Sequence, residues 1–215
     1  GTSAPELVVS LFATTVQHVP DLAVGTILGS NLANIGLILG VSALVAPMPV
    51  TARVVTREVP VMLLLTALLL PIMRDGVVDR MDGLFLVGLL LAYLAFVFRA
   101  VKDEDEEVIG EFEQYISETT HAQKSVWIDA LLLLAGIAGL VLGAGAIVVS
   151  ATHMAEIFGI SGLGVGATIV AIGTSLPELA TSVVAAARNE ADIAVGNVIG
   201  SNVFNIAAIL GITAT

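Results

Sequence analysis

The stretch GTSLPELATSVV, residues 173–184, places a carboxylate, a proline and hydroxyl side chains inside an otherwise apolar run. A charged side chain at the centre of a bilayer costs about 2.5–3.5 kcal/mol even on the lenient insertion scale. Because this cost must be offset, we expect Glu178 to have a functional role. The stretch therefore predicts a functional site within a membrane-spanning segment.

The composition is that of a membrane protein. Of the 215 residues, 57% are hydrophobic and 13% are charged, whereas soluble domains average about a quarter charged residues. The net charge is −11, but eight of the nineteen acidic residues lie between Asp103 and Glu118, so the charge is local and says little about partners. The lack of cysteine excludes disulfides and thiol catalysis, and the three scattered histidines lack zinc-binding spacing.

The apolar runs predict several membrane crossings, because each is long enough to cross about 30 Å of hydrocarbon. Short connectors with charges or helix breakers separate them, and the one long connector is strongly acidic. Most Lys and Arg residues fall in alternate connectors, which places the acidic loop in the cytoplasm. We therefore expect a multi-pass protein of the cell membrane. The runs cover residues 21–46, 56–73, 82–100, 127–152, 162–187 and 191–215, after an incomplete one at 1–18.

Two blocks of the sequence occur twice. GTSAPELVVS at 1–10 returns as GTSLPELATS at 173–182, and DLAVGTILGSNLANIGLILG at 21–40 returns as DIAVGNVIGSNVFNIAAILG at 192–211. Five crossings separate equivalent positions, and an odd number reverses direction, so the copies are antiparallel. Inverted repeats of this kind are typical of secondary transporters, whose substrate site lies at the repeat interface. Because the chain starts inside a repeated motif, we expect it to be a fragment.

The expected fold is therefore all-α, a polytopic transmembrane helix bundle with inverted-topology repeats. Residues 1–100 form the first repeat, incomplete at its N-terminal end, and residues 127–215 form the second, incomplete at its C-terminal end. Residues 101–126 form the acidic cytoplasmic loop. Glycine pairs at Gly25 and Gly29, and again at Gly196 and Gly200, permit close helix approach in both copies.

Each copy supplies the same oxygen-bearing side chains. Proline in a spanning helix removes a backbone donor, so main-chain carbonyls near Thr2 and Thr174 are expected to face a cavity. Two carboxylates in one site of low dielectric repel each other, so the site demands positive charge. An all-oxygen set suits calcium, which takes six to eight oxygen ligands, and sodium fits the same ligand type. The candidate metal-binding residues are Glu6, Glu178, Thr2, Ser3, Thr174, Ser175, Ser30, Ser201, Asn34 and Asn205.

The paired GTSxPE and GSNxxN blocks resemble the alpha repeats of the sodium/calcium exchangers, within the calcium:cation antiporter superfamily. A short cytoplasmic loop resembles that of the prokaryotic members, so the resemblance implies a prokaryotic inner membrane. It also implies that the candidate residues are the ion ligands and that sodium entry drives calcium out. No cofactor, no nucleic acid and no enzymatic activity are expected; the partners are calcium ions, sodium ions and the lipid bilayer, with the oligomeric state left open.

Three alternatives remain at this stage. Some prokaryotic exchangers carry Asp at the position of Asn205, and proton-coupled members carry GNxxE in place of GTSxPE, so the motif favours sodium over protons while use of potassium stays open. A cation channel can also select ions with rings of carboxylates and carbonyls, although inverted repeats with broken helices argue against it. An intramembrane hydrolase using the two carboxylates would lack metal-binding histidines.

Overall fold

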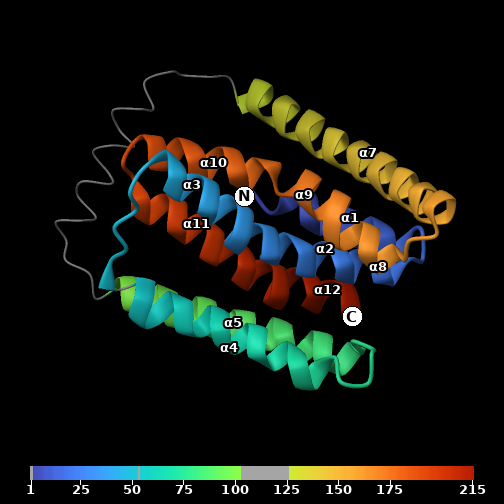
Figure 1. Cartoon of the computed structure of the whole chain (residues 1–215), viewed down its shortest axis with the longest axis horizontal. Helices are drawn as coiled ribbons and strands as arrows, with labels where there is room; N and C mark the ends of the chain where they lie inside the picture. Colours follow the sequence, from blue (N-terminus) through green and yellow to red (C-terminus); the bar gives the residue numbers. More distant parts are fainter. Residues whose placement is uncertain (1, 53, 103–125) are drawn as a thin grey trace.

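The computed structural model describes residues 2–52, 54–102 and 126–215 (Figure 1), so the acidic loop predicted at 101–126 falls almost wholly outside the described residues. The described chain is helical apart from its turns and connectors, and the η elements are π-helical. Its elements are α1 (Ala4–Thr15), α2 (Pro20–Ala33), η1 (Asn34–Ile38), α3 (Leu39–Val45), η2 (Val54–Glu58), α4 (Val59–Ile72), α5 (Arg80–Lys102), α7 (Val126–Phe158), α8 (Gly162–Val165), η3 (Gly166–Val170), α9 (Ala171–Thr174), α10 (Leu176–Ala187), α11 (Ala191–Phe204), η4 (Asn205–Leu210) and α12 (Gly211–Ala214).

The helices match the predicted crossings. Five of them within the described ranges are long and apolar enough to span a membrane, and a sixth span is a pair, Gly162–Thr174 and Leu176–Ala187, bent by 45°. The shorter helix α1 corresponds to the incomplete first run. The expectation of an all-α, multi-pass membrane protein is confirmed.

The two ends of the sequence interleave in the middle of the molecule. In Figure 1, α4 and α5 lie together along one side and α7 lies along the other, with the blue helices α1–α3 and the orange and red helices α8–α12 between them. Helix α2 packs against α8, η3 and α9, while α3 packs against α10. Because α1 and α10 each begin with the repeated acidic motif, this interleaving positions the two motifs for contact.

The repeated motif interrupts its helix at the same point in both copies. Helix α9 ends at Thr174 and α10 begins at Leu176, with Ser175 between them at φ −84° and ψ 6°. Ser3, which precedes α1, has nearly the same backbone, φ −79° and ψ 15°. The proline that follows lacks an N–H group, so it fits the first turn of a new helix but cannot continue the preceding one. The broken helix predicted around Pro177 is confirmed.

A second shared irregularity was not predicted. The π-helical segment η1 begins at Asn34, and η4 begins at the equivalent Asn205. Single π turns inside α-helices occur frequently at functional sites. They change the helical phase over only one turn, which leaves no mark on a hydrophobic pattern read at 3.6 residues per turn.

The close approach that the glycine pairs permit is observed in the first repeat, whereas the described residues do not test it in the second. A Cβ atom at Gly25 or Gly29 would overlap backbone atoms of Leu163 and Ala167, so α2 touches the α8–η3 segment backbone to backbone. A Cβ atom at Gly196 or Gly200 would meet nothing within 4 Å among the described residues. The physical reason is that α8 and η3 precede the second motif in the chain and fill this place for α2, whereas no described segment lies in the corresponding place against α11.

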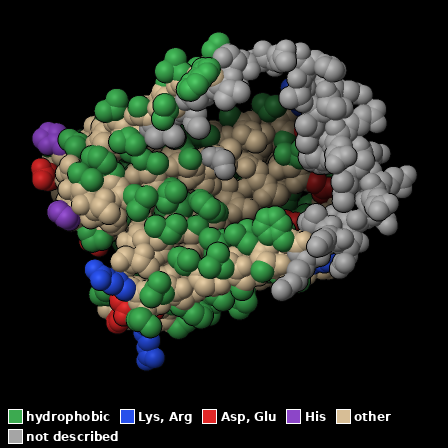
Figure 2. All heavy atoms as spheres, turned by 180° about the vertical axis from the view of Figure 1, so that it is seen from behind, with side chains coloured by type: hydrophobic (Ala, Val, Ile, Leu, Met, Phe, Trp, Pro, Cys, Tyr) green, Lys and Arg blue, Asp and Glu red, His purple; other side chains and the backbone are tan. Residues whose placement is uncertain are grey.

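The surface supports a lipid environment. Figure 2 shows hydrophobic side chains spread over the flanks of the helices on that face, with charged and histidine side chains gathered toward an end of the molecule. Large apolar side chains such as Leu44 and Leu70 are 88% and 79% exposed. In water such exposure would be a liability, whereas lipid solvates these side chains. The buried positions hold apolar residues such as Leu22 and Ile206 together with polar residues such as Ser30 and Asn34.

Gly29→Ala tests the close contact between α2 and η3. The added methyl group would overlap the Ala167 backbone, and overpacking of this kind costs about 1–3 kcal/mol. We expect a lower melting temperature of the purified protein in detergent. Gly40→Ala, whose new methyl group would meet nothing within 4 Å, is the matched control; equal melting temperatures for the two variants would contradict the contact.

Candidate functional site

Glu6 and Glu178 are held by each other's motif. Both carboxylates are 1% exposed, in the first turns of α1 and α10. Ser3 Oγ donates a hydrogen bond to Glu178 Oε1 (2.9 Å), and Ser175 Oγ donates one to Glu6 Oε1 (3.0 Å). Because each serine belongs to the repeat opposite its acceptor, the two motifs meet in one buried cluster. The predicted convergence is therefore observed in the structure.

Four asparagines form a second reciprocal contact. Asn34 Nδ2 donates to Asn202 Oδ1 (2.9 Å), and Asn205 Nδ2 donates to Asn31 Oδ1 (3.0 Å). The two bonds join equivalent positions of opposite repeats, as the serine–glutamate bonds do. Asn31 and Asn202 were absent from the predicted set, although both stand in the duplicated GSNxxN block, and this duplication was the signal that could have found them.

The bonds leave a consistent set of oxygens without a partner. One carboxylate oxygen, Oε2, of both Glu6 and Glu178 is buried and unpaired, as is the amide oxygen Oδ1 of both Asn34 and Asn205. Ser30 Oγ is buried and unpaired as well. Leaving a buried acceptor unsatisfied costs about 1–3 kcal/mol. All five oxygens come from the predicted ligands, and hard cations prefer this donor type.

The other predicted residues surround this cluster with their hydroxyl groups in defined positions. Thr2 Oγ1 donates to Asn197 Oδ1 (3.1 Å), while Thr174 Oγ1 donates to the main-chain carbonyl of Ala171 (3.2 Å). Ser201 is buried. A hydroxyl that donates its proton keeps both lone pairs for another partner, so these oxygens can still face a cation. We call the ten predicted residues together the oxygen cage.

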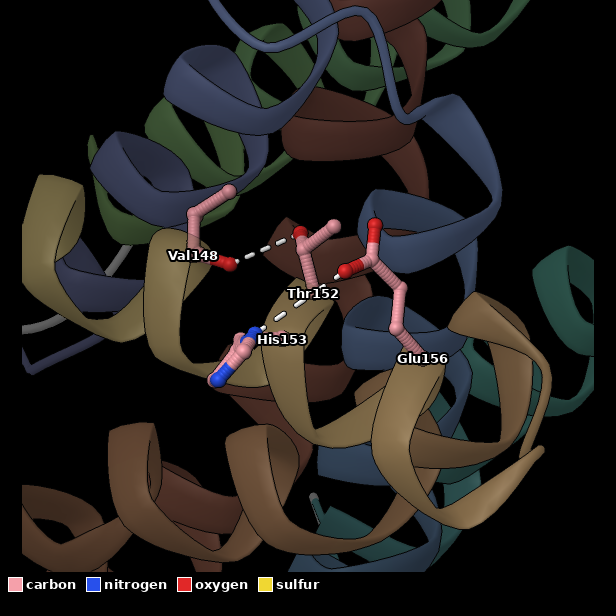
Figure 3. Close-up of polar contacts among 4 residues, drawn as sticks. All are labelled: Val148, Thr152, His153 and Glu156. Carbon is pink, nitrogen blue, oxygen red and sulfur yellow. Dashed lines mark hydrogen bonds and ion pairs between the residues drawn. The ribbon is translucent and has the colours of Figure 1, made fainter.

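A histidine beside a carboxylate lies outside the oxygen cage, on α7. Figure 3 shows His153 beside Glu156 on α7, with Nδ1 3.9 Å from Oε2, near the bond from Thr152 Oγ1 to the Val148 carbonyl (2.9 Å). Both side chains of the pair are more than 70% exposed. Across the described ranges no group of three or more His, Asp or Glu residues is placed to hold a metal. The charge of the oxygen cage thus comes from two carboxylates, and its other oxygens are neutral.

Comparison with known proteins identifies the family. The family model described as sodium/calcium exchanger protein matches residues 1–99 and 128–215. The chain belongs to this family. The family is one of membrane transporters rather than of enzymes, which argues against the intramembrane hydrolase.

Several relatives of this exchanger family match nearly the whole chain. Inner membrane protein YrbG of Escherichia coli is 41% identical over 216 residues, covering 100% of this chain and 66% of its own length. Sodium/calcium exchanger MaX1 of Methanosarcina acetivorans is 32% identical over 245 residues, covering 99% of this chain and 69% of its own length. The chain thus spans about two thirds of the length of the relatives it matches.

A solved exchanger structure shares the fold. The sodium-calcium exchanger NCX_Mj, in a structure soaked with sodium and strontium ions, superimposes with a TM-score of 0.66 at 32% sequence identity. The match covers 99% of this chain and 66% of NCX_Mj. The arrangement of helices described above is therefore that of an exchanger.

Ser175→Ala tests the reciprocal serine–glutamate contact. The variant leaves the buried Glu6 carboxylate without its donor, and a hydrogen bond to a charged group contributes about 1.5–3 kcal/mol. We expect a lower melting temperature in buffer free of calcium and sodium. Ser42→Ala is the matched control, because Ser42 is equally buried but its hydroxyl has no partner. Identical melting curves for the two variants would show that the bond does not stabilise the protein.

Proposed function

We propose that the protein carrying this chain exchanges calcium for sodium across a cell membrane by alternating access. The oxygen cage binds the ions, and Glu6 and Glu178 are its charged ligands. The repeats at 1–100 and 127–215 are the two moving halves, joined by the acidic loop at 101–126. The proposal covers the whole protein, of which this chain is about two thirds when measured against its relatives.

The observation that carries the proposal is the pair of buried carboxylates with one unpaired oxygen each. Among the described residues no Lys or Arg side chain forms an ion pair with either carboxylate. Buried charges without a counter-charge are costly, because the interior cannot replace the lost hydration. A bound calcium ion supplies two positive charges at this point, and several sodium ions can supply the same charge.

The neutral oxygens support an alkaline-earth or alkali cation. Calcium accepts six to eight oxygens in flexible geometry, and the five unpaired oxygens together with the serine and threonine hydroxyls are enough to provide them. Soft metals would require thiolate or imidazole ligands. The calcium and sodium sites share the same carboxylates, so occupancy by one ion excludes the other. Mutually exclusive occupancy of one site is the simplest basis for exchange.

The inverted repeats support alternating access rather than a continuous pore. Two similar halves in opposite orientation can exchange conformations, which opens the central site to one side of the membrane and then to the other. The broken helix at Ser175 and the matching helix start at Ser3 supply the hinges that such a motion needs. The names of MaX1 and NCX_Mj, a sodium/calcium exchanger in both cases, agree with this proposal.

Glu178→Gln tests the role of the carboxylates. The amide keeps the shape of the side chain but removes one negative charge from the cage, so we expect calcium uptake into sodium-loaded proteoliposomes to fall at least a hundredfold. Glu190→Gln, at an exposed carboxylate outside the cage, is the control and should transport normally. Sodium-driven uptake that is unchanged in Glu178→Gln would refute the assigned role.

The counter-ion is tested by changing the gradient. We expect calcium uptake to require sodium inside the vesicle, because the GTSxPE motif favours sodium over protons. The motif leaves the use of potassium open, so uptake is measured with and without potassium. Uptake driven by a proton gradient alone would replace sodium in the proposal, and uptake that fails until potassium is added would make potassium a further transported ion. Single-channel currents in planar bilayers would replace the exchanger with a channel.

A further inference from the structure

The hydrogen bonds of the two repeats match in all the reciprocal pairs described above, but they differ at one position. Residue 197 is asparagine, whereas its equivalent in the first repeat, 171 residues earlier, is Thr26. The described residues form different hydrogen bonds at the two positions, because asparagine stands at one and threonine at the other. Asn197 belongs to neither the predicted set nor the reciprocal asparagine pairs.

Asn197 joins three segments of the site. Its Oδ1 accepts the hydrogen bond from Thr2 Oγ1 (3.1 Å), which comes from the opposite repeat. Its Nδ2 donates to Ser182 Oγ (3.0 Å) and to the main-chain carbonyl of Glu178 (3.4 Å). An amide has one oxygen and two N–H groups, and all three are used here. Asn197 thus bonds both a cage hydroxyl and the backbone of a cage carboxylate.

The part of the chain that the structure describes shows no equivalent contacts in the other half of the site. Thr26 Oγ1 donates to the Leu22 carbonyl (2.8 Å) in its own helix, and Thr174 Oγ1 likewise donates to Ala171 (3.2 Å). Ser10, the equivalent of Ser182, is buried with no partner for its hydroxyl. Threonine commonly bonds back to the preceding turn in this way, so it cannot reach across to the opposite repeat as Asn197 does.

We propose that Asn197 is a positioning residue that pre-organises the Thr2 and Glu178 half of the oxygen cage for cation binding. By accepting the Thr2 proton, it fixes the hydroxyl so that both lone pairs of Oγ1 are free for the ion. By bonding the Glu178 carbonyl, it fixes the first turn of α10, which carries the carboxylate. The inference rests on the proposed function, since it assigns Thr2 and Glu178 to an ion site.

The consequence is a functional difference between two halves that look alike in sequence. Fixing ligands before binding lowers the entropic cost of ordering them, and this raises affinity without any new contact to the ion. Asn197 gives the Thr2 and Glu178 half a contact between the repeats, whereas the Thr174 hydroxyl bonds only within its own helix in the other half. The loss of Asn197 should therefore weaken ion binding more than it slows transport.

Asn197→Thr copies the residue of the first repeat and is the direct test. In proteoliposomes of the protein that carries this chain, we expect the KM for calcium to rise about tenfold, equivalent to one hydrogen bond of about 1.4 kcal/mol, while the maximal rate stays within about twofold. Thr26→Val, which alters the equivalent position outside the cage, should leave both values unchanged. A loss of maximal rate with an unchanged KM would mean that Asn197 has a merely structural role.

A double-mutant cycle separates positioning from general damage. Thr2→Val removes the hydroxyl that Asn197 orients, so adding Asn197→Thr to it should raise the KM by clearly less than tenfold. Full additivity of the two effects would overturn the inference. If Asn197→Thr folds poorly, Ser182→Ala, which removes only one acceptor of Asn197, should still raise the KM by about two- to threefold, and no rise would count against the inference.

A thermal-shift titration keeps this test distinct from that of the proposed function. If the wild-type protein exchanges calcium for sodium and Asn197→Thr binds calcium normally, the inference alone fails. If the wild-type protein does not exchange them, the proposed function fails. The titration with calcium, strontium, sodium and potassium chloride then shows which cation raises the melting temperature, and Asn197→Thr should need about tenfold more of that cation. An equal requirement in both proteins would overturn the inference in that case too.

Discussion

The structure depends on the burial of two carboxylates, each held by a serine of the opposite repeat. Neither motif can form this contact alone, because Ser3 reaches Glu178 and Ser175 reaches Glu6. These hydrogen bonds stabilise the fold only where water is excluded, since exposed interactions of a charged group contribute little. Burial of the carboxylates therefore links the fold to the site. The repeats must run in opposite directions for each serine to reach the glutamate of the other repeat.

Other elements of the fold position these serine–glutamate contacts between the repeats. The prolines start α1 and α10 beside the acidic residues, and the glycines of α2 let the η3 backbone come close enough for α9 to reach the centre. The π-helical turns begin at Asn34 and Asn205, whose amides pair across the repeats while their oxygens stay free. Polar groups lie buried in the bundle beside an apolar core, and further large apolar side chains such as Leu44 and Leu70 face outward, where lipid solvates them.

Much of this arrangement could be predicted from the sequence because duplication is a strong signal. The membrane crossings follow from the apolar runs, and the opposite orientation of the copies and the meeting of Glu6 with Glu178 follow from two blocks that return after an odd number of crossings. The π turns could not be predicted, since they shift the phase of a helix without altering its hydrophobic pattern. Asn197 was missed for the opposite reason: a search for repeats selects what is shared, and its importance lies in differing from Thr26.

The most direct measurement of the central claim is the anomalous diffraction of calcium in crystals of the protein that carries this chain. The account predicts one strong peak between the two motifs, with Oε2 of Glu6 and Oε2 of Glu178 both about 2.3–2.6 Å from the ion, and the loss of that peak at high sodium concentration. A calcium ion bound away from both carboxylates, or carboxylates that turn toward lipid when calcium is present, would contradict it.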